Sequence, residues 1–177
     1  MAVQRIRPRH LGTLAVALAF GLALAAPVAA AQVKLDRAWG SGTRAQIDAD
    51  STPPYFEFNA SSNADGTAPT GSFIFKTLVS AFTGTIQCLD VNGKTATLVG
   101  RIGTATGGFD GTQGTLFVTV VVDNGTATRR HPSPDTMAGV TFGITDATVE
   151  QLCADPYSQV GTDMFSLVSG DLTVIDR

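Results

Sequence analysis

Aspartates beside turns are the residues of this sequence best suited to acid and base chemistry. Asp90, Asp110 and Asp123 each lie one to three residues before a glycine. Two carboxylates held about 5 to 10 Å apart can hydrolyse a glycosidic bond, and such a pair can converge in space without any sequence signature. A carboxylate-based hydrolase that uses these aspartates is therefore one hypothesis for the function.

His131, Ser133 and Asp135 have the side-chain types of a hydrolase triad. Triad members normally come from separate elements that converge in space, whereas these three are neighbours in one proline-rich loop. The prolines hold the backbone extended and splay the side chains apart. The Gly-x-Ser-x-Gly motif is also missing from the sequence. We therefore interpret this segment as a solvated loop and assign no catalytic residue.

Motifs for phosphate and metal binding are incomplete. Gly93-Lys94-Thr95 resembles the end of a P-loop, but Cys88 stands where that motif needs its first glycine. The segment that follows has a strand pattern, whereas a P-loop is followed by a helix. The Asp/Asn/Gly turns offer oxygens for calcium without the spacing of a calcium loop. We expect no cofactor and no metal ion.

The chain contains two cysteines, Cys88 and Cys153. C-x-x-C is absent, and the two cysteines make a poor zinc site. Two cysteines far apart in an exported protein most simply form a disulfide. Two buried free thiols are the alternative.

The N-terminal segment has the features of an export signal. Three arginines within the first nine residues provide a basic start, and an uncharged apolar run covers residues 11–26. Small residues then fill Pro27–Ala31, so a signal peptidase could cleave after Ala30 or Ala31. The apolar run is shorter than the roughly 20 residues that span a bilayer, which argues against an uncleaved anchor. We predict a signal peptide over 1–31.

The remaining residues, 32–177, form a single secreted β domain in this prediction. Removing the signal takes away three of the 12 basic residues and none of the 15 acidic ones, which leaves a net charge of about −6. Nucleic acids and anionic membranes require basic patches, so neither is expected as a partner. Glycine, threonine and valine are abundant, and ten phenylalanines are present. This composition is typical of sheets joined by glycine turns.

A hairpin is the clearest local signal. Asn92-Gly93 lies between two runs of β-branched residues, and both residues tolerate the positive φ that a type I′ turn needs at its two central positions. The expected register places Val91 opposite Lys94, Leu89 opposite Ala96, Cys88 opposite Thr97 and Ile86 opposite Val99.

Alternating apolar residues predict the other strands. Tyr55–Asn59 and Ser72–Lys76 each carry a Phe-x-Phe pair and should be neighbours that contribute rings to one core. Thr115–Asp123 is apolar on both faces, as expected of a central strand. Weaker signals predict strands over 44–48 and 140–144, a last pair of strands over 164–168 and 172–175, and a short helix over Asp146–Cys153 capped by Asp146.

Eight or nine short strands at regular spacing are typical of β-sandwiches and barrels. The predicted fold is therefore all-β: a single antiparallel β-barrel or β-sandwich of about eight or nine strands. The apolar faces carrying Phe56, Phe73 and Leu116 are expected to converge. In a barrel they would either fill the interior or line a cavity for one small ligand.

Three segments give the chain a resemblance to other proteins. They are Cys88–Ala96, Val122–Gly125 and Ser169–Val174. Together they resemble uncharacterised small secreted β-proteins of actinobacteria, whose pattern is approximately C-L-x-V-x-G-N-x-A followed by D-N-G. Lys94 stands where that pattern often has asparagine. The resemblance implies a secreted β-fold and transfers no activity.

Two classes of function remain. The first is a secreted non-catalytic β domain that binds a small or apolar ligand or a component of the cell envelope. The second is the carboxylate-based hydrolase. The fold class and the lack of clustered acid and base residues favour the first.

The first testable prediction concerns export. The mature protein should begin at Ala31 or Gln32, because the basic start, the apolar run and the small residues together specify cleavage there. Mass spectrometry of the protein from the extracellular fraction measures this directly. Finding the sequence from Met1 to Ala26 still attached in that fraction would contradict the prediction.

Overall fold

The computed structural model describes residues 34–45, 52–125 and 135–177. These residues belong to one compact unit, Gln32–Arg177. The predicted signal peptide, His131 and Ser133 lie outside the described residues, as does most of the strand predicted over 44–48.

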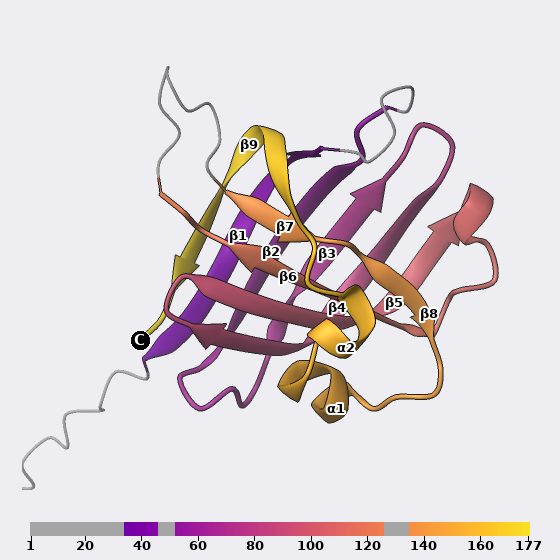
Figure 1. Cartoon of the computed structure of the whole chain (residues 1–177). Coiled ribbons are helices and arrows are strands. Elements are labelled where there is room, and N and C mark those ends of the chain that lie inside the picture. The colour runs from indigo at the N-terminus through magenta and orange to yellow at the C-terminus, as the bar shows by residue number, and fades with distance from the viewer. Residues whose placement is uncertain (1–33, 46–51, 126–134) are drawn as a thin grey trace, which may run out of the picture. The chain divides into compact units, whose positions relative to one another are not determined.

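The described part of the chain forms nine strands and three short helices (Figure 1). The bounds are β1 Leu35–Arg44, β2 Tyr55–Asn63, β3 Thr70–Lys76, β4 Ala81–Asn92, β5 Thr95–Thr106, η1 Gly107–Phe109, β6 Leu116–Val122, β7 Thr136–Ala138, β8 Thr141–Ile144, α1 Val149–Ala154, α2 Tyr157–Val160 and β9 Met164–Ile175.

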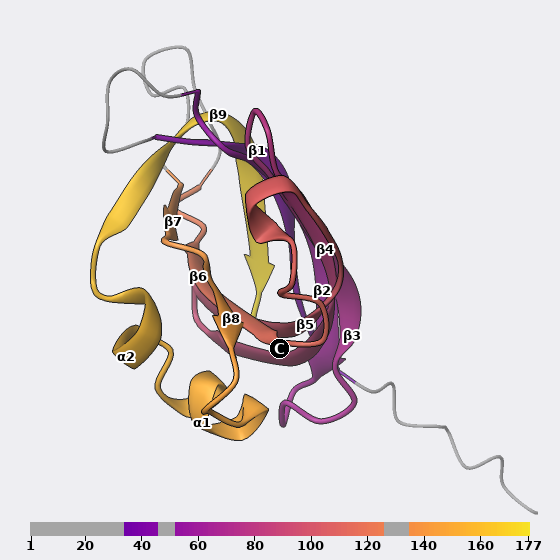
Figure 2. The same ribbon diagram turned by 90° about the vertical axis from the view of Figure 1, so that its right-hand side faces the viewer.

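Eight of these strands close into an antiparallel barrel, in the order β1-β2-β3-β4-β5-β6-β7-β9 and back to β1. The ninth, β8, continues β7 along the same edge of β6. The β6 edge pairs with β7 at Val121 and Val122, and with β8 at Leu116, Phe117 and Val118. Figure 2 shows the strands wrapping around the interior, with α1 and α2 outside it. The predicted all-β fold is confirmed, as a barrel with one extra strand.

Phenylalanine rings fill the barrel. The two Phe-x-Phe strands are neighbours, as predicted, with Phe56 opposite Phe75 and Phe58 opposite Phe73. The rings of Phe73 and Phe117 lie 4.8 Å apart between centroids, within the range of stacked aromatic pairs. Other buried rings continue the stack, so the interior is a packed core. Its phenylalanines are Phe56, Phe58, Phe73, Phe75, Phe82, Phe109 and Phe117.

Two glycines make room for the central ring. A Cβ atom placed on either Gly84 or Gly100 would lie 2.5 Å from the ring of Phe117. Real Cβ contacts do not come that close, so the ring packs directly against the backbones of β4 and β5 at these positions. Glycine is needed here for space rather than for an unusual φ angle.

The hairpin forms, but its register differs from the prediction. The turn residues are Gly93 and Lys94, and Gly93 at the first position has φ 61°. A glycine with positive φ at that position is the pattern of a type II′ turn, in which Lys94 needs no positive φ. Asn92 is therefore part of β4 and lies opposite Thr95. The pairing moves by two residues relative to the prediction, and Leu89 faces the interior.

A bulge in β4 was also absent from the prediction. The register shifts between Ile86 and Cys88, which makes Gln87 an extra residue in the strand. Ile86 and Leu89 consequently both face the barrel core, while Cys88 faces outward. The predicted register had placed Ile86 and Cys88 on the same face.

The first and last strands were predicted incorrectly, because both contain glycines that allow close contact between backbones and give no apolar signal. In β1, Gly40 stands where an apolar side chain would have signalled a strand, and its Cβ would lie 2.5 Å from the carbonyl oxygen of Asp171. The predicted last pair of strands is one bent strand, β9, in which Gly170 has φ 105°. Gly42 lies opposite Gly170, so the two backbones touch.

Two carboxylates complete the closure of the barrel. Because β7 has three residues, it pairs with β9 only at Met164–Ser166. Further along β9, the N–H of Leu172 donates to Asp135 over 2.7 Å and the N–H of Val174 donates to Asp123 over 3.1 Å. The two carboxylates thus accept the backbone N–H groups of β9 beyond the point where its pairing with β7 ends.

Each of the two carboxylates accepts further hydrogen bonds. Asp135 is fully buried and also accepts the N–H of Asn124 over 2.8 Å. Asp123 is 6% exposed and accepts the N–H of Gly125 over 2.9 Å and the Lys94 ammonium over 3.3 Å. The expectation that Asp135 lies in a solvated loop is therefore wrong. Burial raises the pKa of Asp135 above its ordinary value of 3.8.

The second prediction concerns Asp135→Asn. The amide NH2 cannot accept either of the two backbone N–H groups, whereas the hydroxyl oxygen of the protonated carboxyl can turn its hydrogen away and still accept one. The variant should therefore be less stable by about 1 to 3 kcal/mol at acidic pH. Because the pKa of Asp135 is raised in the folded protein, its contribution to the free energy of unfolding is fully present below pH 3.8. That contribution declines as the pH rises through the folded pKa. Urea unfolding from pH 3.5 to 7 should show the gap between the two proteins narrowing with increasing pH. A gap that widens, or an equal effect in the exposed control Asp110→Asn, would contradict this account.

Candidate functional site

A second apolar layer lies outside the barrel. Leu116 and Val118 of β6 face outward and pack with Leu152 of α1. Phe117, between them, faces the phenylalanine core. The prediction that the face carrying Leu116 joins that core is therefore wrong, because β6 has a separate apolar cluster on each face. The outer cluster positions α1 against the barrel wall.

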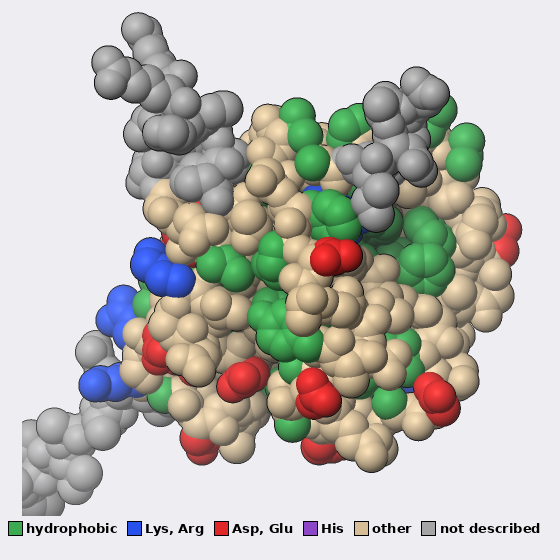
Figure 3. All heavy atoms as spheres, in the orientation of Figure 1, with side chains coloured by type: hydrophobic (Ala, Val, Ile, Leu, Met, Phe, Trp, Pro, Cys, Tyr) green, Lys and Arg blue, Asp and Glu red, His purple; other side chains and the backbone are tan. Residues whose placement is uncertain are grey.

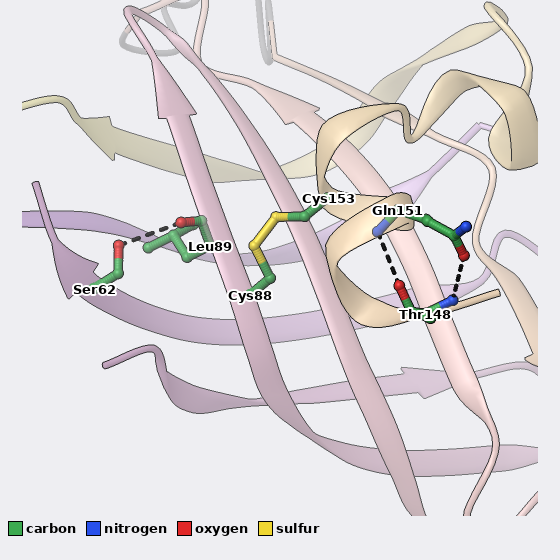
Figure 4. The surroundings of a disulfide bond; sticks show 6 residues. All are labelled: Ser62, Cys88, Leu89, Thr148, Gln151 and Cys153. Atoms are coloured by element: carbon green, nitrogen blue, oxygen red, sulfur yellow. Dashed lines mark hydrogen bonds between the residues drawn. A yellow bond between two sulfur atoms is a disulfide. The ribbon is translucent and has the colours of Figure 1, made fainter. Parts of the chain in front are cut away.

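The start of α1 is fixed by a capping box (Figure 4). The Thr148 hydroxyl accepts the N–H of Gln151 over 3.2 Å, and the Gln151 side chain accepts the N–H of Thr148 over 2.9 Å. Thr148 is the N-cap, where the sequence had predicted Asp146. Two orphan donors are satisfied at once, which a short helix needs.

A disulfide ties α1 to β4. Cys88 and Cys153 are bonded, with Cα atoms 6.3 Å apart, as the sequence predicted (Figure 4). The bulge at Gln87 directs Cys88 toward the helix, so the bond depends on a local irregularity in the strand. It holds the junction between α1 and α2 beside the end of the β4–β5 hairpin.

A pocket of about 450 Å³ lies between that junction and the hairpin. Its volume is within the range of small-molecule sites. Its two carboxylates, Asp90 and Asp155, each follow a bonded cysteine by two residues. Residues of β4, β5 and the helix junction line it: Asp90, Asn92, Thr95, Thr97, Cys153, Ala154, Asp155, Pro156 and Tyr157.

The polar side chains that line the pocket form no hydrogen bonds or ion pairs with other described residues. The side chains of Asp90, Asn92 and Asp155 are exposed and make no hydrogen bond or ion pair within the described residues. Thr97 also lines the pocket, and its hydroxyl has no partner there either. These polar groups are available to form hydrogen bonds with a ligand.

The electrostatic character of the pocket is negative. No lysine or arginine lines it, and Lys94, next in sequence to Thr95, is engaged by Asp123. Figure 3 shows acidic side chains gathered on the lower part of this face, around α1 and α2. Tyr157 adds an aromatic ring that is 43% exposed. Carboxylates and an aromatic face together suit a positively charged ligand.

The aspartates proposed for hydrolysis do not converge. Asp90 lies opposite Thr97 near the hairpin turn, whereas Asp110 follows the far end of β5 at Thr106. Nine residues of strand separate these ends by about 30 Å. Asp123 is buried in the contact with β9. Only Asp90 of the three therefore lines the pocket.

Within the described ranges, no group of three or more His, Cys, Asp or Glu side chains could hold a metal ion. Among the same residues, no helix is long and apolar enough to cross a membrane. No protein-family model, curated protein or solved structure matched the chain. The function must therefore be argued from the pocket itself.

Sequence reasoning missed Asp155 and Tyr157. Both follow Cys153 closely, as Asp90 follows Cys88. The predicted disulfide already implied that the residues after the two cysteines lie near each other. That implication was the one signal in the sequence that could have indicated the pocket.

The third prediction concerns the disulfide. Thiol titration of the denatured, non-reduced protein should find no free thiol. The bond closes a loop of 65 residues, so the double variant Cys88→Ser, Cys153→Ser should lose about 4 kcal/mol of unfolding free energy, less any strain released. Two reactive thiols in the purified, non-reduced protein would show that the cysteines are not paired.

Proposed function

We propose that this chain is an exported, non-catalytic binding protein that holds a small molecule bearing an ammonium group and hydroxyl groups. The observation that carries the proposal is the pocket in which Asp90 and Asp155 are unpaired, no basic residue is present and the Thr97 hydroxyl is free to bind a ligand. Carboxylates accept hydrogen bonds from an ammonium group, and such charge-assisted bonds are stronger than neutral ones.

Several features support binding over hydrolysis. Catalysis by a carboxylic acid needs a carboxyl group kept away from water, whereas Asp90 and Asp155 are both exposed. The pocket walls are rigid, because β4, β5 and the disulfide-bonded α1 provide them. A pre-formed site of this kind loses little entropy on binding. The resemblance to small secreted proteins supports export and assigns no activity.

The size of the pocket favours an organic cation over a bare metal ion. A calcium ion needs six to eight oxygen ligands at 2.3 to 2.6 Å, in a much smaller space. Two carboxylates in about 450 Å³ leave room for a sugar-sized molecule. Tyr157, on the rim, can cover an ammonium group through its ring.

The fourth prediction tests this site by calorimetry with glucosamine, glucose and calcium chloride as probes. Glucosamine should bind, and glucose, which lacks the ammonium group, should bind at least about tenfold more weakly. Asp90→Asn and Asp155→Asn should each weaken glucosamine binding by about tenfold or more. Thr97→Val, which removes the hydroxyl at nearly constant volume, should weaken it by a smaller factor.

Asp110→Asn is the matched control, because it removes an exposed carboxylate far from the pocket. It should leave the affinity for glucosamine unchanged. Equal binding of glucose and glucosamine would contradict the role of the carboxylates. Tight calcium binding that Asp90→Asn abolishes would replace the organic cation with a metal ion as the ligand.

A further inference from the structure

The only tryptophan of the chain, Trp39, lies on the outer wall of the barrel. It is in the middle of β1, opposite Asn59 of β2 and Thr173 of β9, and 40% of its surface is exposed. Its ring makes no aromatic or cation contact with another described residue. The core does not need this ring, because β1 presents Ala38 to the interior. A ring exposed to this extent is open to contact with a ligand.

The ring borders an open groove of about 310 Å³. Arg37, Trp39, Asn59, Ala60 and Ser61 line it. Among the described residues, the side chains of Arg37, Trp39 and Asn59 have no hydrogen-bond or ion-pair partner. The groove therefore offers a guanidinium, an indole N–H and a carboxamide that are all free to bind a ligand.

The outer wall around the groove is polar, and it also carries two exposed carboxylates, Glu57 and Asp171, both opposite Ser41 of β1. Pairs of hydroxyl groups bridge neighbouring strands on this outer wall, at Thr43 with Ser169 over 2.8 Å and at Ser61 with Thr70 over 3.0 Å. An apolar partner would gain little on such a surface. Nucleic acid would need several basic residues, and Arg37 is the only one that lines the groove.

The lining has the chemistry of a carbohydrate site. The flat face of an indole can stack against the C–H face of a sugar ring, and an amide and a hydroxyl can bond to sugar hydroxyl groups. The guanidinium is the side chain best shaped for a carboxylate, which it binds through two parallel hydrogen bonds. The charge of this groove is opposite to that of the pocket beside the disulfide, so the two sites must select different ligands.

We propose that Trp39 and Arg37 form a binding surface for a polysaccharide chain that carries carboxylate groups. Every residue that lines the groove belongs to β1 or β2, so a polymer can pass across this wall while one sugar unit stacks on Trp39. This surface is separate from the pocket of Asp90 and Asp155, and either site can exist without the other.

The fifth prediction uses the fluorescence of Trp39, which reports on this groove because the chain has no other tryptophan. Titration of the full chain with polygalacturonate should change the emission in a saturable manner. Dextran, a neutral polymer, should bind at least about tenfold more weakly. Electrophoresis through gels that contain each polymer should show the same preference as retardation.

Variants of Trp39 and Arg37 distinguish the contribution of ring stacking to polygalacturonate binding from the contribution of charge. Trp39→Ala should lose retardation by polygalacturonate by about tenfold or more, as expected for an aromatic anchor. Arg37→Ala should reduce the preference for polygalacturonate over dextran, and Arg37→Lys should restore only part of it. Tyr157→Leu, which changes an exposed aromatic residue in the other site, is the matched control and should bind polygalacturonate like the wild type. Thermal unfolding checks that each variant is folded.

Two results would overturn the inference. One is unchanged Trp39 emission at saturating polygalacturonate. The other is retardation of Trp39→Ala equal to that of the wild type, which would mean attraction by charge alone. Neither result bears on glucosamine binding, and loss of that binding in Asp90→Asn would leave the polygalacturonate result intact.

Discussion

The closure of this barrel depends on two buried carboxylates that replace missing backbone partners. A barrel removes exposed sheet edges only if every strand is paired on both sides, and β7 is too short to cover β9. Asp123 and Asp135 accept the N–H groups of Val174 and Leu172 at alternate positions along β9. Since β9 in turn pairs with β1, the wall that carries Trp39 depends on the same two side chains. Burying the Asp135 carboxylate is costly, and the same burial raises its pKa; the backbone N–H donors of Leu172 and Asn124 offset part of that cost.

The outer layer explains why a binding pocket forms on the wall of the barrel rather than inside it. Phenylalanine rings fill the interior, and the Phe117 ring packs directly against the glycine backbones of β4 and β5. A ligand therefore has to bind outside, where α1 and the disulfide build a second wall over β4 and β5. The bulge at Gln87 is the local irregularity that makes this possible, because it turns Cys88 outward while Ile86 and Leu89 stay in the core. Bulges often re-aim a side chain in this way.

Sequence analysis predicted the features that follow from residue types at short spacing, and it missed the features that depend on tertiary contacts. The Phe-x-Phe strands, the two-faced β6 and the cysteine pair were predictable, because each follows from residue types at short spacing. The hairpin turn was displaced by one residue, since Asn92-Gly93 and Gly93-Lys94 both satisfy turn chemistry and only the packing of the strands decides between them. β1 was missed because Gly40 and Gly42 let its backbone lie close to that of β9, and glycine gives no apolar signal. The pocket joins residues about 60 positions apart, which only the disulfide indicated.

The two proposed sites should act independently. β1 and the β4–β5 hairpin are separated by β2 and β3 on one side of an eight-strand ring, so their outer surfaces point in different directions. Coupling between sites requires an element with two arrangements whose balance both ligands shift. The walls between these sites are continuous hydrogen-bonded strands over a core of stacked rings, and close-packed interiors resist small continuous deformations. A rigid frame of this kind suits a protein that attaches to a polymer on one wall while it holds a small cationic molecule on another.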